Sequence, residues 1–227
     1  MLTFIQFITQ GGAVIWALTL CSVIAVTVFF YKIWQFWGEL KLSDNNADHA
    51  RKLIEKNQRN DALKLIDNNS NPRAQLIFQI LQLFDNSLLD LNAAKAESIR
   101  LAQLLIAQLN SYLRVLEVIA MIAPLLGLLG TVLGMIEAFK AMEAAGSQVN
   151  PAILSGGIWQ ALLTTAVGMA VAIPVSIVHS YFERKVEVET AKISDDIGWL
   201  FTLQTTINHN KTHLKTVQTA ATLQNAS

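Results

Sequence analysis

The sequence predicts an all-α integral membrane protein that crosses the bilayer three times. Of its 227 residues, 52% are hydrophobic and only 15% are charged, and the mean hydropathy of +0.39 is high for a soluble domain. The 17 basic and 17 acidic residues are confined to part of the chain and leave long uncharged runs. No run of useful length alternates as a strand does.

The first predicted span covers residues 13–31, 19 residues without a charge, which is close to the roughly 20 that cross a hydrocarbon core. The preceding segment, 1–12, lacks the basic start and cleavage site of a signal peptide. We therefore expect the span to be retained. Lys32, Trp34 and Trp37 follow it and are typical of an interfacial anchor.

Two further runs with almost no charge define the second span, 118–138, and the third span, 157–182. A short loop, 139–156, joins them. The other residues form a long loop, 32–117, after the first span, and a tail, 183–227. Three crossings place the two termini on opposite sides of the membrane.

The basic residues predict the orientation. Lys41 and Arg114 flank the long loop, and Arg184 and Lys185 follow the third span, whereas the short loop holds only Lys140, with Glu137 before it and Glu143 after it. Lys and Arg collect on the cytoplasmic side of membrane proteins. We therefore expect the long loop and the tail in the cytoplasm, with the amino terminus and the short loop on the outer side of the membrane.

The cytoplasmic part reads as a helical bundle. Residues 48–67 have the apolar spacing of one amphipathic helix, and a second helix is expected at 72–84. From residue 91 the helical pattern continues into the second span with no Gly or Pro before Pro124, which predicts one helix of roughly 50 residues. The third span is expected to continue similarly to residue 203.

Small residues recur every three or four positions in the second and third spans. In lipid, helices associate by close backbone approach, so such stripes mark contact faces. They pack against each other or against a partner, and a proline in each span, Pro124 and Pro174, predicts a kink. The stripes are Ala123, Gly127, Thr131, Gly134 and Ala138, with Gly130 beside them, and Gly157, Ala161, Thr165, Gly168 and Ala172.

Polar groups accompany the stripes. Gln160, Thr164 and Thr165 lie within one and a half helical turns, and an amide in hydrocarbon is costly unless it has partners or faces a wet cavity. The ordinary reading is packing, with each threonine hydroxyl bonded to its own helix. The functional reading is a narrow aqueous path lined by Thr131, Thr165, Thr164 and Gln160.

One absence bears on that path. Residues 118–136 and 144–182 contain no Asp, Glu, Lys or Arg, and His179 is their only histidine. A chain that relays protons through a membrane normally has an intramembrane carboxylate. If protons pass here, another polypeptide must supply that group.

Two runs resemble the signatures of the ExbB/TolQ/MotA family. Residues 123–136, APLLGLLGTVLGMI, are similar to its second-span motif. Residues 156–169, GGIWQALLTTAVGM, followed by Ala172-Ile173-Pro174, are similar to its third-span motif. Two long motifs in order, joined by a short loop, make a specific match. Three spans rather than the four usual in MotA-type stators favour the ExbB and TolQ branches, and ExbB most.

The resemblance implies a homopentamer in the bacterial inner membrane, with a pore lined by its second and third spans. The pore would hold an ExbD- or TolR-like dimer of single-span chains that carry a proton-accepting aspartate. Thr131 and Thr165 match the pore threonines of the family, with Thr164 as their neighbour. Force would leave through a TonB-like or TolA-like periplasmic protein. Gln160 stands where a glutamate is common, which leaves proton or sodium use open.

The resemblance favours an ExbB-like energiser of TonB-dependent outer-membrane transport. A TolQ-like subunit of the Tol-Pal system is the alternative within the family, and a passive membrane scaffold is the alternative of another class. An enzyme is not expected, because no Ser/His/Asp set, HExxH motif or pair of membrane carboxylates is present. We also expect no cofactor, no nucleic-acid partner and no metal site, since Cys21 stands alone and nothing flanks His209 and His213 as a further ligand.

Overall fold

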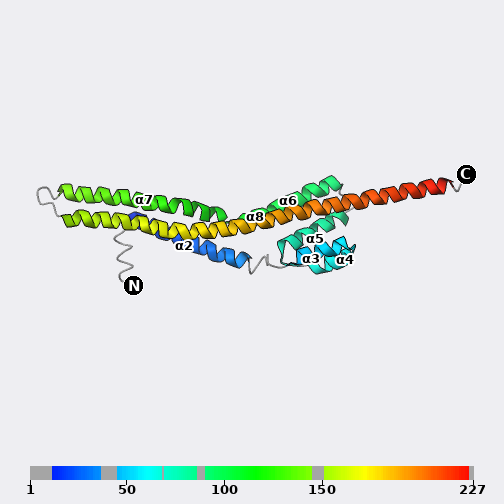
Figure 1. The fold of residues 1–227 in the computed structure, drawn as a ribbon, viewed down its shortest axis with the longest axis horizontal. Helices are drawn as coiled ribbons and strands as arrows, with labels where there is room; N and C mark the ends of the chain where they lie inside the picture. The colour runs from blue at the N-terminus through cyan, green and yellow to red at the C-terminus, as the bar shows by residue number, and fades with distance from the viewer. Residues whose placement is uncertain (1–11, 37–44, 68, 86–89, 145–150, 225–227) are drawn as a thin grey trace. The chain divides into compact units, whose positions relative to one another are not determined.

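The structure, a computed structural model, describes residues 12–36, 45–67, 69–85, 90–144 and 151–224. Within these ranges every regular element is helical, as the sequence predicted. The helices, labelled in Figure 1, are α2 (Gly12–Trp34), α3 (Asn46–Glu55), α4 (Arg59–Ile66), α5 (Pro72–Asp85), α6 (Leu91–Asn110), α7 (Leu113–Ala144) and α8 (Pro151–Gln224). Most of the predicted amino-terminal segment, Trp37, Lys41 and the middle of the short loop lie outside the described residues.

The chain divides into two compact units, and the long helix α8 contributes to both. The first unit comprises residues 1–35 and 110–185, and therefore α2, α7 and the first part of α8. The second unit comprises 36–109 and 186–227.

Three stretches are long and apolar enough to cross a membrane: Gly12–Trp34, Leu91–Ala144 and Leu154–His209. Their number agrees with the three crossings predicted from the sequence. Large apolar side chains on all three point outward, as expected of surfaces that meet lipid or other subunits; examples are Trp16, Leu125 and Ile177. The chain is a multi-pass membrane protein.

In the first unit, α7 and the first part of α8 run side by side (Figure 1). α2 packs on them through a small apolar core of Val14, Leu18, Ala123 and Ala172. These contacts join positions that are far apart in the sequence, so they tie the first span to the other two. Pro124 and Pro174 both lie inside continuous helices.

The helix expected to run unbroken into the second span is interrupted. α6 ends at Asn110 and α7 begins at Leu113, and between them Tyr112 adopts φ of 63°. A residue in the left-handed conformation ends a helix, and this conformation costs a non-glycine residue roughly 1–2 kcal/mol. The Tyr112 ring packs edge-on against Tyr31, with 5.1 Å between ring centres. This tertiary contact lies at a helix break that was not predicted, because the sequence has no glycine or proline there.

The second unit holds α3 to α6 and the remainder of α8. The prediction of a single amphipathic helix at 48–67 is wrong, because the structure has two helices there, α3 and α4. The break between them includes Asn57, which has φ of 61°. Asparagine tolerates this left-handed conformation better than most residues do. α5 begins at Pro72 and ends at Asp85, one residue beyond its predicted end.

Candidate functional site

The two small-residue stripes meet each other in the first unit. A Cβ atom added at Gly127 would lie 3.1 Å from the Cα of Thr165 and 3.2 Å from the carbonyl oxygen of Thr164. A Cβ at Gly168 would lie 2.7 Å from the carbonyl oxygen of Ala123 and 3.0 Å from the Cα of Gly127. Only glycine allows backbones to approach this closely. Of the two packing arrangements that the sequence left open, the structure shows α7 against α8 within one chain.

The contact extends in both directions along the helices. A Cβ at Gly134 would meet the Cβ of Ala161 at 3.1 Å, and one at Gly157 would meet the Cβ of Ala138 at 2.5 Å. Gly130 faces the side chain of Thr164. The six residues predicted for helix packing are thus all found along this contact: Gly127, Gly130, Gly134, Gly157, Ala161 and Gly168.

Thr165 is the threonine that bridges the two helices. Its Oγ1 donates a hydrogen bond of 3.1 Å to the carbonyl oxygen of Gly127, 38 positions earlier in the chain. The hydroxyl oxygen keeps its lone pairs, so it can still accept a hydrogen bond. The side chain is half-buried, and it therefore lies at the edge of the contact and not in its centre.

The other predicted pathway residues are placed differently. Thr164 is only 3% exposed and donates to the carbonyl oxygen of Gln160 at 2.9 Å, within its own helix. Thr131 is half-buried and returns its hydroxyl hydrogen to Leu128 at 2.7 Å. Gln160 is exposed. The structure thus brings Thr164 and Thr165 into the helix contact and leaves Thr131 and Gln160 beside it.

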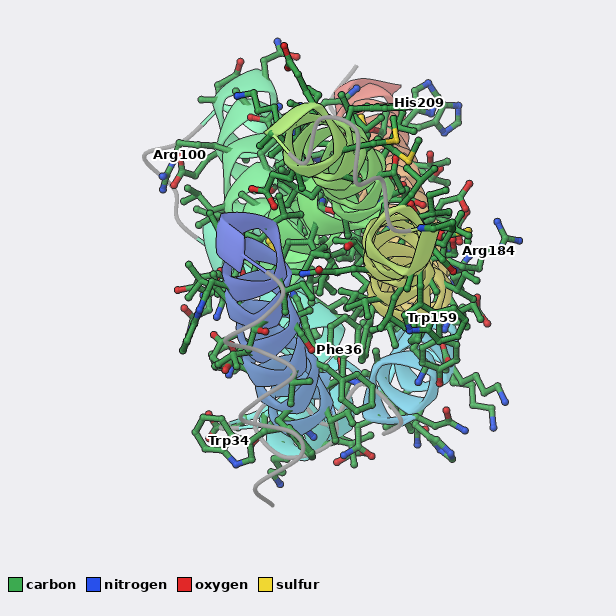
Figure 2. The ribbon with its side chains drawn as sticks, turned by 90° about the vertical axis from the view of Figure 1, so that its left-hand side faces the viewer. Trp34, Phe36, Arg100, Trp159, Arg184 and His209 are labelled. Atoms are coloured by element: carbon green, nitrogen blue, oxygen red, sulfur yellow. The ribbon has the colours of Figure 1, made fainter. Side chains whose placement is uncertain are left out.

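The ends of the spans carry the charges. His179 Nδ1 lies 3.9 Å from the Oε2 atom of Glu183, near the expected end of the third span. At the end of α2, Lys32 is fully buried and donates 2.8 Å to Oε1 of Gln35, whereas Trp34 is 64% exposed and points away from the helix (Figure 2). Lys32 and Trp34 are the anchor residues that the structure describes. In the single chain, only Trp34 is exposed enough to lie at a membrane surface.

An ionic cluster around the buried pair Arg73 and Asp196 in the second unit was not anticipated from the sequence. Arg73, on α5, donates 2.9 Å to Asp196 of α8 and 3.0 Å to Asp48 of α3. Arg51 binds Asp195 and lies 4.8 Å from the ring centre of Trp199. The cluster joins three helices of this unit. Arg51 and Asp195 are 144 positions apart, so no local pattern reveals the cluster.

Electrostatics favour the charged form of the two arginines in this cluster, whereas burial raises the pKa of the Asp196 carboxyl against its hydrogen bond with Arg73. Burial alone lowers the pKa of the Arg73 guanidinium, but its hydrogen bonds to Asp196 and Asp48 outweigh burial and raise the pKa above the ordinary value. The hydrogen bond to Asp195 likewise raises the pKa of Arg51. Both arginines therefore stay cationic, and the arrangement is a structural clamp. In the described part of the chain, no three His, Cys, Asp or Glu side chains gather as metal ligands do.

Known proteins are similar in sequence to this chain. The sequence pattern of the MotA/TolQ/ExbB proton channel family matches residues 69–195. The biopolymer transport protein exbB1 of Vibrio cholerae is 31% identical over 169 residues, which cover 74% of this chain and 74% of the relative. An ExbB-like biopolymer transport protein of Synechocystis is 27% identical over 190 residues, 83% of this chain and 89% of its own. The biopolymer transport protein ExbB of Salmonella typhimurium is 35% identical over 95 residues, 42% of this chain and 37% of its own.

Proposed function

This chain belongs to the MotA/TolQ/ExbB proton channel family, and we infer that it is the ExbB-like channel subunit of an inner-membrane motor driven by the proton-motive force. In this proposal it forms a homopentamer around an ExbD-like dimer and energises TonB-dependent outer-membrane transport through a TonB-like protein. The relatives described above bear ExbB names, which favours this role over a TolQ-like one in the Tol-Pal system.

One observation carries the proposal. Residues 118–136 and 144–182, which make up most of the second span and all of the third, offer hydroxyl and amide groups but contain no Asp, Glu, Lys or Arg. Polar groups of this kind can hydrate and orient a proton carrier, but they cannot themselves carry the proton at neutral pH. The carrier in this mechanism is the aspartate of the ExbD-like partner, which the family resemblance implies.

The proposed path uses Thr131, Thr165 and Gln160. Each has an exposed or half-buried side chain, so each is available to a helix that lies against α7 and α8. Thr164 joins the path only where α7 and α8 separate, because its side chain packs on Gly130 in the closed contact.

The energy available per step is modest. A proton that crosses about 100 mV releases roughly 2.3 kcal/mol. It neutralises the partner's carboxylate, and the neutral side chain then moves past an apolar wall that would have opposed a charge. Each transfer turns one component against the other. Gln160 keeps hydrogen bonding but adds no titratable group to this cycle, so we propose proton use with the carboxylate supplied entirely in trans.

A specific observation favours the second candidate, a passive scaffold. The hydroxyls of Thr131, Thr164 and Thr165 all donate to backbone carbonyls, which is the bonding expected of threonines that only pack. A scaffold would lose nothing but packing when these hydroxyls are removed. A channel would lose its polar path.

The test is the double variant Thr131→Ala/Thr165→Ala, expressed with the ExbD-like and TonB-like partners. Assembly is measured by native mass spectrometry, and coupling by proton flux and by energy-dependent uptake across the outer membrane. The proposal expects an intact complex with coupling reduced at least tenfold. The matched control is Thr19→Ala/Thr27→Ala, because these threonines of α2 donate to backbone carbonyls four residues earlier and lie outside α7 and α8. If the test variant kept full coupling, the channel proposal would be refuted and the passive scaffold would be the remaining candidate function.

A further inference from the structure

An apolar cavity lies in the first unit. Its volume is about 420 Å³ and it opens to the outside of the helices. Three helices contribute to its wall, which is mostly apolar and includes one hydroxyl, that of Ser22. Among its lining residues are Ala25, Val26 and Phe29 of α2, Leu116 of α7, and Ala170 and Pro174 of α8.

Two alanines and a proline create this space. Ala25 and Ala170 leave room where larger side chains would close the wall, and Pro174 has no N–H to donate to the carbonyl of Ala170 one turn earlier. All lining residues belong to the stretches that are able to cross a membrane. An apolar cavity does not hold ordered water, because water needs two to four polar partners. Because these stretches are long and apolar enough to cross a membrane, we expect the hydrocarbon of a bilayer outside the cavity.

Residues typical of the membrane surface lie just beyond one end of the cavity. Phe29, in its wall, packs against Phe182 with 6.4 Å between ring centres. Lys185 Nζ lies 5.3 Å from the ring centre of Tyr181, and Arg184 points outward (Figure 2). Aromatic rings and long basic side chains collect at head-group level. Lys185 is seven residues beyond Val178, another lining residue, which is about 10 Å along a helix.

We propose that this cavity binds one acyl chain of a phospholipid, whose phosphate lies within reach of Lys185. The occupant matches the wall in polarity, and the cation at head-group level matches the phosphate in charge. A lipid held here would fill the space between α2 and α8 and stabilise the position of the first span. The inference depends on the chain spanning a bilayer and not on ion transport.

The test uses the assembled complex in vesicles of phosphatidylethanolamine and phosphatidylglycerol that contain phosphatidylglycerol with a diazirine in mid-chain. After irradiation, mass spectrometry locates the adducts. We expect them on residues 22–29 and 170–178, and we expect Ala170→Leu to reduce them at least threefold. The control is Ala166→Leu, since Ala166 is also an exposed alanine of α8, one turn earlier, but does not line the cavity. Equal labelling of all three proteins would overturn the proposal.

A second measurement keeps the test decisive if Ala170→Leu fails to assemble. In the otherwise unchanged chain, benzoylphenylalanine replaces Val26, which is exposed and lines the cavity. Cross-links to phospholipid support the proposal. Cross-links to a second copy of the chain would instead identify the cavity as a subunit interface and refute it. Lys185→Gln is expected to lower adduct yield about twofold without moving the adducts, because it removes only the contact with the phosphate.

Discussion

The hydroxyl of Thr165 donates a hydrogen bond to the carbonyl oxygen of Gly127 across the contact between α7 and α8. One side chain therefore serves the helix contact and, in the proposed mechanism, the ion path. The two roles differ in what they require, since packing requires the shape of threonine and ion transfer requires its oxygen.

Thr165→Val separates these roles. Valine keeps the shape and removes the oxygen, and an interhelical hydrogen bond in a membrane contributes only about 0.6 kcal/mol on average. We expect the complex to assemble with nearly unchanged thermal stability while energy-dependent uptake falls at least tenfold. Thr165→Ser, which restores the hydroxyl, should recover most of the uptake. Normal uptake in the valine variant would show that the oxygen is dispensable.

Gly168→Ala tests the closeness of the helix contact. The new methyl would meet the carbonyl oxygen of Ala123 at 2.7 Å, and backbone cannot move aside as a flexible side chain can. Overpacking of this kind costs roughly 1–3 kcal/mol, so we expect a lower melting temperature of the detergent-solubilised complex.

Gly156→Ala is the matched control for that change. Gly156 lies in the same helix, and nothing stands within 4 Å of an added Cβ. Alanine is a better helix former than glycine by about 1 kcal/mol, so this variant should melt no lower than the parent. If both variants behave alike, the approach of α7 to α8 is looser than the structure shows.

The buried ion pair of the second unit predicts a non-additive response. Arg73 and Asp196 have side chains only 7% and 1% exposed. Removing one partner of a buried pair leaves an uncompensated charge at a cost of roughly 3–5 kcal/mol, whereas replacing both with apolar residues is often neutral. Arg73→Met should thus destabilise the protein strongly, and Arg73→Met/Asp196→Leu should recover much of the loss in thermal unfolding.

A surface pair supplies the comparison for this cycle. Arg100 binds Glu97 on the exposed side of α6, at 2.6 Å. Exposed pairs contribute about 0–1 kcal/mol, so Arg100→Met should leave the melting temperature almost unchanged. A double variant of Arg73 and Asp196 that is no better than Arg73→Met would rule out a clamp that acts through paired charges.

The predicted orientation is testable by cysteine labelling. In a Cys21→Ser background, Lys140→Cys places a thiol after the second span and Lys56→Cys places one in the long loop, both at exposed positions. A membrane-impermeant maleimide added to spheroplasts should label position 140, whereas position 56 should react only after lysis. The reverse pattern would invert the topology that the basic residues predict.

Particular residues show which parts of the fold could be predicted from the sequence and which could not. Long runs without charge predict spans directly, because a charge in hydrocarbon is costly wherever it falls in the fold. The glycine stripes marked the face that α7 and α8 share, for a similarly local reason. The breaks at Asn57 and Tyr112 were missed because neither residue obliges a helix to end.

The sequence by itself determined that the chain has three segments long and apolar enough to cross a membrane, since the bilayer constrains the polarity and length of each segment separately. The spacing of its small residues also predicted which faces of the second and third spans allow a neighbouring helix to approach closely. Only the tertiary structure decided that these faces meet each other, that Thr165 bonds to Gly127, and that Arg73 finds Asp196, 123 positions away. Such pairings depend on which surfaces the folded chain brings together, and no periodicity along the sequence encodes that choice.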